Sequence, residues 1–375
     1  MAYKDKTKIV AEGGTGKQSN TTYGVIAGGT SSTGNVQNIT NGASGTFLTS
    51  AGASALPTWE TQPTIWENLA SDPSSPTNGQ VWFNTASSAF KGAKLGSTAW
   101  TVVASMNTAR MRLAGTGTSS AALSIGGFTT VGLKTTESYV TDVWTSKNNC
   151  NSEHTWGAAS GTSSDALIFG GDGNNAVTEK WDGTNWTTVN SLNSGRGRLA
   201  GCGTTSDALS MGGISSSVSV NTVERWDGTN WSTVTSLSVT RHGLGGADTA
   251  ATALAFQGYN STGGTYTSAN ELYNGTSWTS KADALYAYRY IASSGSSGNA
   301  LSYGGYNAGT KSAAEAYTGG GTNSWSAVAS LNVAIYSAGG AGSDNTSALS
   351  FGGDATTAAT EKYGSSATIY TFTVT

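Results

Sequence analysis

Charged residues, proline, cysteine and histidine are all scarce in this chain. Only 11% of its 375 residues carry a charge and the formal net charge is −3, which gives no indication of a nucleic acid or a membrane surface as partner. Two cysteines are too few for a disulfide framework, and two histidines without a Cys-x-x-Cys motif do not make a metal site. The sequence therefore predicts no metal and no other cofactor.

Long apolar runs are missing as well. No stretch approaches the roughly 18 apolar residues of a membrane-spanning helix. The first residues, MAYKDKTKIVAEGG, lack the apolar region of a signal peptide. Glycine, in contrast, is abundant, with 52 residues against four prolines, and there are 12 tryptophans. This composition is typical of a turn-rich β protein rather than a disordered chain.

One stretch, DALIFGGDGNNAVTEKWDGTNW at residues 165–186, recurs along the chain. In each copy an Ala-Leu pair precedes a Gly-Gly, and a glutamate with an aromatic residue two positions later follows it. The copies lie about 42 to 48 residues apart, a period that indicates a solenoid or a propeller. The diglycine sites, one of which has lost a glycine, begin at Gly126, Gly170, Gly212, Gln257, Gly304 and Gly352.

Each repeat contains four short runs of strand character. Gly, Ser, Thr and Asn are frequent and penalise helix interiors. In the unit that starts near Arg196, the runs RLAGCG, ALSMGG, TVERWD and NWSTVTS predict strands a to d. An Asp-Gly-Thr-Asn turn joins strands c and d as a tight hairpin. Four antiparallel strands per period predict an all-β protein with a β-propeller fold.

The repeat resembles the kelch family of propellers over residues 105–375. The resemblance rests on apolar-Gly-Gly in strand b, Glu-x-aromatic in strand c and Trp in strand d. It weakens at Gln257 and in the last unit, where Ile369 or Tyr370 stands in place of the tryptophan. Residues 61–104 lack the Gly-Gly and Glu-x-aromatic motifs, but Trp100 is in phase with the strand d tryptophans. We interpret this segment as a degenerate first blade of seven; the alternative is six blades with the segment as a neck.

Residues 1–60 contain too few apolar residues to bury a core alone, so we expect them to fold on partners or on copies of the chain. The run from EGGTG to ASALPTW resembles the N-terminal repeats of tailed-phage fibre and appendage proteins. The segment at 61–104 is similar to the region before kelch-type repeats in structural proteins of marine phages and cyanophages. The resemblance implies location in a virion, attachment to other virion proteins through residues 1–60, and a homo-oligomer, with a trimer favoured.

Two sets of residues are candidates for ligand binding on the face formed by the variable b–c loops. A basic series opens strand a and is expected to surround the mouth of the central channel, where it would attract an anionic or hydroxyl-rich ligand. The alternative is that each arginine pairs with a carboxylate of its blade. The series comprises Arg110, His154, Arg196 and Arg241, with Arg289 one residue out of register.

The second set is a group of tyrosines in one sector of the ring, which could stack on sugar rings or could simply pack between strands. Its members are Tyr259, Tyr266, Tyr286, Tyr288 and Tyr306. The repeated glutamates occupy one fixed offset, so we interpret them as structural, and the sequence predicts no catalytic residue and no enzyme. The predicted function is that of a virion protein which binds a glycan or protein of the host surface. The alternatives are a virion protein that binds only its virion neighbours, or a polysaccharide-degrading or oxidase enzyme.

Overall fold

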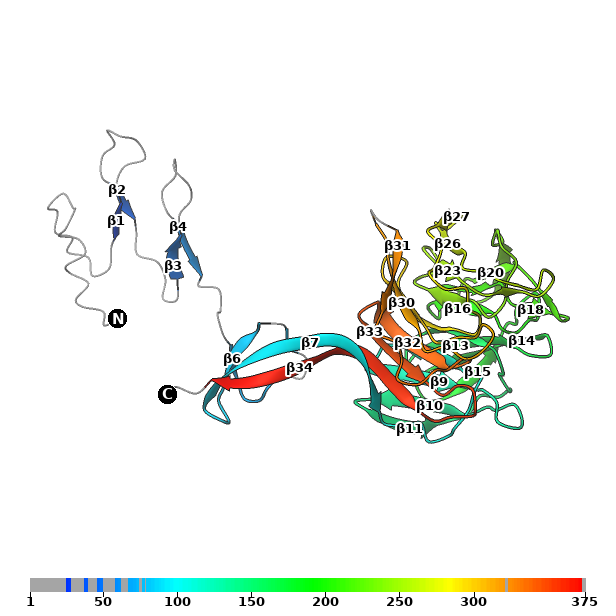
Figure 1. Ribbon diagram of the computed structural model, residues 1–375, viewed down its shortest axis with the longest axis horizontal. Helices are drawn as coiled ribbons and strands as arrows, with labels where there is room; N and C mark the ends of the chain where they lie inside the picture. Colours follow the sequence, from blue (N-terminus) through cyan, green and yellow to red (C-terminus); the bar gives the residue numbers. More distant parts are fainter. Residues whose placement is uncertain are drawn as a thin grey trace. The chain divides into compact units, whose positions relative to one another are not determined.

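The computed structural model describes residues 67–73, 76–77, 79–320 and 323–372, together with four short strands before them. β1 (Val25–Ala27) pairs antiparallel with β2 (Gln37–Ile39), and β3 (Thr46–Thr49) pairs with β4 (Thr58–Thr61). The rest of the predicted attachment segment, residues 1–60, lies outside the described residues. The chain divides into two compact units, residues 96–366 and residues 1–95 with 367–375 (Figure 1).

The first five blades of the larger unit are four-stranded antiparallel sheets in which the sequence order runs from the innermost to the outermost strand. The strands of the first three blades are β8 (Ala114–Gly117), β9 (Ala121–Ile125), β10 (Thr136–Val140) and β11 (Val143–Lys147); β12 (Ala158–Gly161), β13 (Ala166–Gly171), β14 (Asn175–Trp181) and β15 (Trp186–Val189); and β16 (Ala200–Gly203), β17 (Ala208–Met211), β20 (Val223–Trp226) and β21 (Trp231–Val234). The strands of the next two are β22 (Gly245–Ala247), β23 (Leu254–Phe256), β26 (Asn270–Tyr273) and β27 (Trp278–Lys281); and β28 (Ala292–Gly295), β29 (Ala300–Tyr303), β30 (Ala314–Thr318) and β31 (Ser324–Val328).

Two b–c loops carry a further small hairpin. The first pairs β18 (Ile214–Ser215) with β19 (Val218–Ser219), and the second pairs β24 (Tyr259–Asn260) with β25 (Thr265–Tyr266). Across the described residues the secondary structure is entirely β, and none forms a helix able to cross a membrane.

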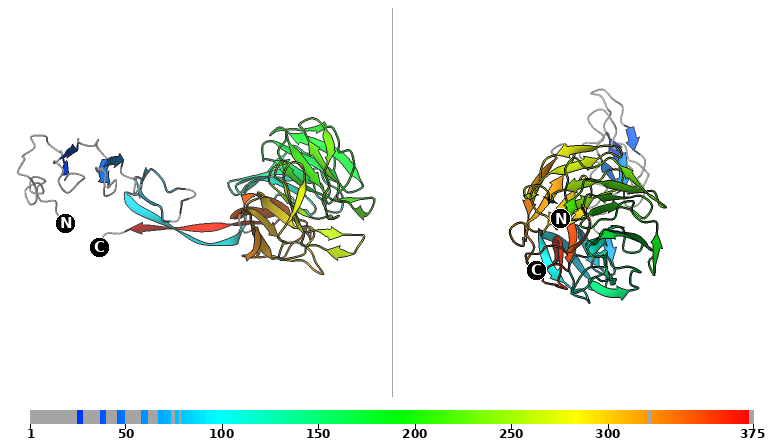
Figure 2. Two further views of the ribbon diagram at one scale, coloured as in Figure 1. Left: turned by 90° about the horizontal axis from the view of Figure 1, so that it is seen from above. Right: turned by 90° about the vertical axis from the view of Figure 1, so that its right-hand side faces the viewer.

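The innermost strands show how many blades the ring has. They contact one another in the order β8, β12, β16, β22, β28 and β32 (Gly339–Asp344), and β32 contacts β8 again. Figure 2 shows this succession of blades around a ring. The described part of the chain therefore forms a six-bladed β-propeller. The six-bladed alternative fits, and the seven-bladed prediction is not confirmed.

The sixth blade is completed by a strand from the other end of the repeat region. Its sheet runs β32, β33 (Ser347–Phe351), β34 (Thr360–Phe372) and then β7 (Ala89–Val103). The Trp100 ring lies 5.2 Å from that of Tyr363 and 4.9 Å from that of Tyr303, centroid to centroid. Trp100 therefore supplies the strand d tryptophan that the last repeat lacks, in place of Ile369 or Tyr370. Residues 61–104 do not form a blade of their own. Their strand β7, which carries Trp100, instead completes the sixth blade.

The smaller unit continues from the same two long strands. β6 (Val81–Asn84) pairs antiparallel with the first residues of β7, and β5 (Glu67–Leu69) runs parallel to β6. The boundary between the units falls at Gly96, so the predicted segment of residues 61–104 is shared between them.

The repeated motifs have the packing roles that their positions suggest. In the third blade the Trp231 ring packs 5.5 Å from Trp226, and its Nε1 donates to Thr178 Oγ1 of the preceding blade at 3.0 Å. The first glycine of the pair needs a positive φ, and a Cβ at Gly170 would come within 2.7 Å of the Arg196 carbonyl oxygen of the next blade. Glycine thus lets neighbouring blades approach closely.

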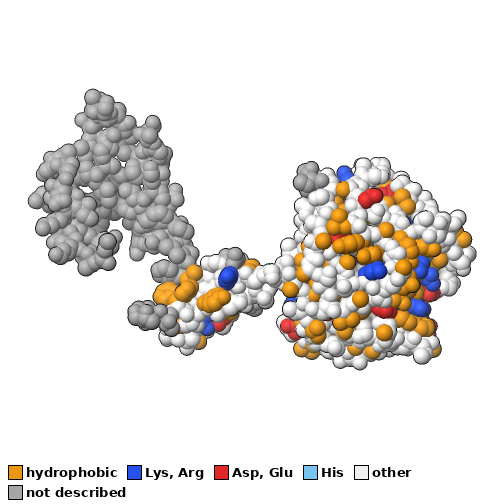
Figure 3. All heavy atoms as spheres, viewed as in Figure 1, with side chains coloured by type: hydrophobic (Ala, Val, Ile, Leu, Met, Phe, Trp, Pro, Cys, Tyr) orange, Lys and Arg blue, Asp and Glu red, His pale blue; other side chains and the backbone are white. Residues whose placement is uncertain are grey.

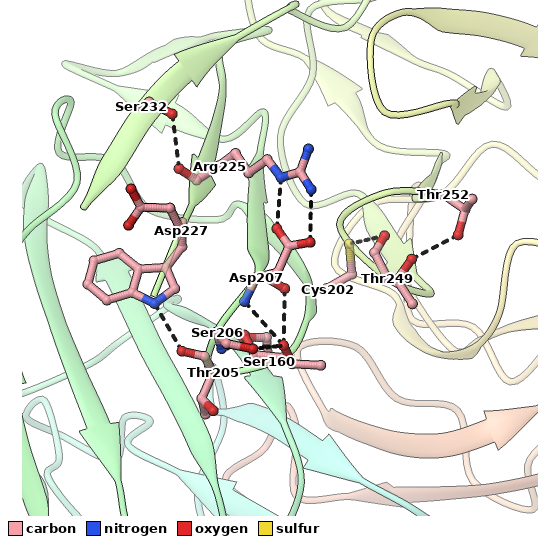
Figure 4. A network of polar contacts seen from close by, with 12 residues as sticks. Ser160, Cys202, Thr205, Ser206, Asp207, Arg225, Asp227, Ser232, Thr249 and Thr252 are labelled. Carbon is pink, nitrogen blue, oxygen red and sulfur yellow. Dashed lines mark hydrogen bonds and ion pairs between the residues drawn. The ribbon is translucent and has the colours of Figure 1, made fainter. Parts of the chain in front are cut away.

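The turns at the opposite end of the blades are fixed by short polar contacts. In the third blade Arg225 Nε donates to Asp207 Oδ1 at 2.7 Å, and Trp226 Nε1 donates to the Thr205 carbonyl at 3.0 Å (Figure 4). In the c–d turn, Asp227 Oδ1 accepts two backbone N–H groups, which confirms the tight hairpin. Cys202, nearby, is a buried free thiol. Figure 3 shows that charged side chains are few and scattered on the visible side of the propeller.

Candidate functional site

The b–c loops and the residues that precede strand a lie on the same face of the propeller, as the strand count predicts. Bridges between the two segments recur in four blades: Met111 with Phe128, Gly197 with Ile214, His242 with Tyr259, and Arg289 with Tyr306. The variable b–c loops therefore lie beside the starts of the inner strands. We call this side of the propeller the mouth face, because the central channel opens there.

A closed ring of hydrogen bonds surrounds this mouth. Each blade contributes one residue with a left-handed φ of 56 to 61°, and its N–H donates to the carbonyl of the equivalent residue in the preceding blade at 2.7–2.9 Å. The six residues are Arg112, Trp156, Arg198, Gly243, Tyr290 and Ser337. We call this set the mouth ring. Because the backbone geometry is the same in every blade, only the side chains distinguish one position from the next.

The mouth ring lines a central cavity of about 80 Å³. A second, wider cleft of about 340 Å³ lies between the first two blades and is lined by Arg112, Phe128, Glu153 and Asp172. Arg112 borders both spaces. The two hollows are therefore neighbours on the mouth face.

In the mouth ring, two guanidinium groups flank the aromatic ring of Trp156. The rings of Trp156 and Tyr290 lie 4.3 Å apart, and the guanidinium carbons of Arg112 and Arg198 each lie 5.6 Å from the Trp156 ring. Arg198 also forms an ion pair with Asp172 at 3.5 Å. Cation–π contacts of this kind hold a guanidinium in place and leave its N–H groups available for an acceptor.

Arg289 is surrounded by the predicted tyrosines. Its guanidinium carbon lies 4.4 Å from the Tyr259 ring, 5.5 Å from Tyr266 and 5.4 Å from Tyr306. It also lies 4.8 Å from Tyr290, which joins this cluster to the mouth ring. The structure therefore brings together one arginine and three tyrosines of the predicted set.

Two further tyrosines of that set stand apart from this cluster. Tyr286 and Tyr288 stack on each other with centroids 5.2 Å apart and planes 2° from parallel. They precede strand a of the fifth blade, where Tyr288 occupies the register of the basic series. No described ring contact links either tyrosine to Arg289.

The other three arginines of the predicted series are inside the blades. Arg110, Arg196 and Arg241 have no exposed surface, and each forms an ion pair with the glutamate of its own blade, for example Arg241 Nη2 with Glu271 Oε1 at 2.9 Å. Burial lowers the pKa of Arg241 to about 10, with the charge of Glu271 opposing the shift. A ligand at the surface cannot reach these side chains, so the candidate site does not include them.

The repeated glutamates serve the same purpose in every blade. Each accepts a hydrogen bond from a backbone N–H of the connection that enters its blade, from Asn107 to Glu137 at 2.7 Å in the first and from Asn332 to Glu361 at 2.8 Å in the sixth. In the second blade His154 replaces arginine and lies 3.1 Å from Glu179. Their recurrence thus has a structural explanation.

The fifth blade replaces the missing arginine in another way. Its glutamate, Glu315, has no cation beside it, but the Gln257 side chain reaches across from the fourth blade and donates to Glu315 Oε1 at 2.9 Å. Gln257 Oε1 accepts from Ser302 Oγ at 2.6 Å, and the equivalent serine of the third blade, Ser210, accepts from Arg196 Nη2 at 2.7 Å. Gln257, which stands where the fourth blade has lost a glycine, therefore supplies the hydrogen bonds that the missing arginine of the fifth blade would have made.

Burial raises the pKa of Glu315 to about 7. Because its pKa in the unfolded chain is near 4.5, the native state holds this proton more tightly, and stability is lost as pH rises from 4.5 to 7. We expect Glu315→Gln to remove this loss: the free energy of unfolding of the variant relative to wild type should increase by about 3 kcal/mol over that interval. Urea unfolding at several pH values measures the difference, and a difference independent of pH would contradict the assignment.

Sequence reasoning missed three half-buried members of the mouth ring. Arg112 and Arg198 stand two residues after Arg110 and Arg196, in the patterns RMR and RGR, and Trp156 stands two residues after His154. The first basic residue of each pattern belongs to the scaffold and the second position belongs to the mouth ring. The sequence did contain a signal for the site. The residue two positions after the basic register differs from blade to blade, although the register itself recurs with the repeat.

The polar and aromatic side chains of this face can hold a ligand by hydrogen bonds, ion pairs and ring stacking. Among the described residues no group of three or more His, Cys, Asp and Glu side chains is placed to hold a metal ion. His242 borders the Arg289 cluster, and burial, with the charges of Arg198 and Arg289, lowers its pKa to about 4. It is therefore neutral near pH 7. Its Nδ1 lies 2.9 Å from Ser219 Oγ and its Nε2 lies 3.4 Å from the Tyr290 hydroxyl.

Comparisons with known proteins agree with the fold. No family model matches the chain, and no curated protein sequence matches it. A solved structure described as "Structure of YjhT" is similar with a TM-score of 0.56 over 71% of this chain and 99% of that one, at 12% sequence identity. At this identity the likeness concerns the fold alone.

Proposed function

We propose that this chain is a structural protein of a tailed-phage virion, with a kelch-type propeller whose mouth face binds a glycan of the host surface. The observation that carries the binding part is the cluster around Arg289, in which a guanidinium and the half-exposed rings of Tyr259, Tyr266 and Tyr306 share one surface. Aromatic faces stack on the apolar faces of sugars, and guanidinium groups donate to their hydroxyl oxygens.

The virion part of the proposal rests on the sequence. Residues 1–60 resemble the attachment repeats of phage fibres, and their apolar inventory is too small for an independent core. They would join the protein to its virion neighbours and assemble it as a trimer. Several copies of a weak sugar site on one particle would then bind a cell surface far more tightly than one copy.

The test uses a glycan array and adsorption of the full chain to host cells. Tyr266→Ala should weaken binding about tenfold, because it removes a stacking surface, and should leave the melting temperature nearly unchanged. Tyr370→Ala, an exposed tyrosine of the smaller unit, is the matched control and should bind as wild type does.

The alternatives give different results in the same experiments. A protein that binds only its virion neighbours would adsorb to neither glycans nor cells, and shortened products after incubation with host polysaccharide would indicate an enzyme. Light scattering of the same full-length sample should give the mass of a trimer, and a monomer would contradict that part of the proposal.

A further inference from the structure

The arginines of the propeller fall into two classes that differ in their partners. The scaffold arginines each have a carboxylate partner: Arg196, for example, donates to Glu224, to Ser210 Oγ and to three backbone carbonyls. The side chain of Arg112, in contrast, makes no hydrogen bond and no ion pair within the described residues, and its guanidinium carbon lies 4.8 Å from the Phe128 ring and 5.6 Å from the Trp156 ring. A half-buried guanidinium without an acceptor is a binding group for an anion.

The central cavity contains further polar atoms without partners. Trp156 Nε1 and Ser337 Oγ are both buried and lack a hydrogen bond, and both residues line this cavity. Ser337 is 4% exposed. A buried polar group without a partner is unfavourable, and a ligand that supplies the partner removes that cost. The indole N–H can only donate and the serine hydroxyl can donate, so an acceptor would satisfy both.

The charged residues that line the central cavity are both cationic. Arg112 and Arg198 line it, and no described carboxylate does. Asp172, 3.5 Å from Arg198, and Glu153 line the neighbouring cleft instead. Burial raises the pKa of Asp172 and so disfavours its charged form, although the charges of Arg198 and Arg112 oppose this shift. Burial also lowers the pKa of His242, and the charges of Arg198 and Arg289 add to that shift.

The size of the cavity suits a small anionic group. A space of about 80 Å³ has room for several water molecules, or for a carboxylate or sulfate group. The sugar that carries the group would lie beside Tyr290 and the cluster around Arg289. The neighbouring cleft of about 340 Å³ provides room for a further sugar unit.

We propose that the cavity enclosed by the mouth ring is an oxyanion pocket, which holds a carboxylate or sulfate substituent of an acidic saccharide between Arg112 and Arg198, with Trp156 Nε1 and Ser337 Oγ as further donors. The proposal deepens the glycan-binding function and rests on it for the identity of the ligand. It requires no change of the protein backbone, because the mouth ring is already closed by hydrogen bonds.

Calorimetry of the full chain with three trisaccharides tests the saccharide class. Trigalacturonate or a sulfated galactose trisaccharide should bind at least about tenfold more tightly than neutral galactotriose, and the preference should decrease at high salt. Arg112→Gln and Arg198→Gln should each remove about tenfold for the acidic ligand and leave the neutral one unchanged. The control is Lys147→Gln with Lys180→Gln, which removes two charges from strands elsewhere in the propeller. Equal affinities for the three ligands, or an equal effect of the control, would overturn the pocket while leaving neutral-glycan binding intact.

A second measurement tests the pocket without a glycan. The Trp156 indole N–H resonance, assigned with Trp156→Phe, should shift saturably when the full chain is titrated with sodium sulfate or sodium galacturonate, and sodium chloride at the same ionic strength should not reproduce the shift. The shift should be lost in Arg112→Gln. Absence of a saturable shift overturns the pocket, whereas a shift without any glycan binding retains the pocket and rejects the proposed function.

Discussion

Arg196→Gln should lower the free energy of unfolding by about 3–5 kcal/mol, whereas Arg112→Gln should change it by no more than about 0.5 kcal/mol. The two changes are chemically identical and differ only in their surroundings. Arg196 has no exposed surface, and its removal leaves the buried carboxylate of Glu224 without a cation. Arg112 makes no ion pair among the described residues, so no buried charge loses its partner.

Urea unfolding of both full-length variants, followed by tryptophan fluorescence, measures this difference. Glutamine tolerates the left-handed φ of residue 112 about as well as arginine does, so backbone strain does not confound the comparison. Equal losses in the two variants would mean that Arg112 stabilises the propeller as much as Arg196 does. The distinction between structural and ligand-binding arginines would then be wrong.

Trp100→Ala should destabilise the propeller by about 3–5 kcal/mol. Trp100 is 4% exposed, packs against Tyr303 and Tyr363, and donates from Nε1 to the Ala329 carbonyl at 3.0 Å. These partners lie more than 200 positions further along the chain. The change would therefore leave a cavity where β7 joins the last blades of the ring.

The exposed aromatic Tyr370, on β34, supplies the control for this change, and Tyr370→Ala should stay within about 0.5 kcal/mol of wild type. Denaturant melts of the full chain, with near-ultraviolet circular dichroism as the probe of aromatic packing, measure both. If Trp100→Ala were as mild as Tyr370→Ala, β7 would not close the sixth blade.

The repeat alone was enough to predict the propeller and its blade motifs. Ala-Leu, Gly-Gly, Glu-x-aromatic and Trp recur because each blade needs a buried strand, a close approach between blades, a cap for the entering chain and an aromatic filler. Blade number was harder, because Trp100 has the phase of a strand d tryptophan whether its strand begins a new blade or completes the last one. Only spatial proximity to Tyr363 distinguishes the two.

The candidate site was predictable in part, and the difference has a physical reason. The tyrosines of one sector departed from the repeat, and three of them do surround Arg289. The basic series followed the repeat, and a residue that recurs with the scaffold usually serves it, as the ion pair of Arg110 with Glu137 illustrates. Arg112 was not predicted because the repeat marks only the register of Arg110, whose side chain lies inside the blade. Arg112 stands two residues later, on the rim of the channel.

A crystal structure of the full chain soaked with trigalacturonate at about ten times its dissociation constant would show directly whether the mouth holds an acidic saccharide. We expect ligand density at the mouth of the propeller, with one carboxylate in the central cavity and within hydrogen-bonding distance of Arg112 and Arg198. Ligand bound to another face, or a cavity that contains solvent alone at that concentration, would contradict it.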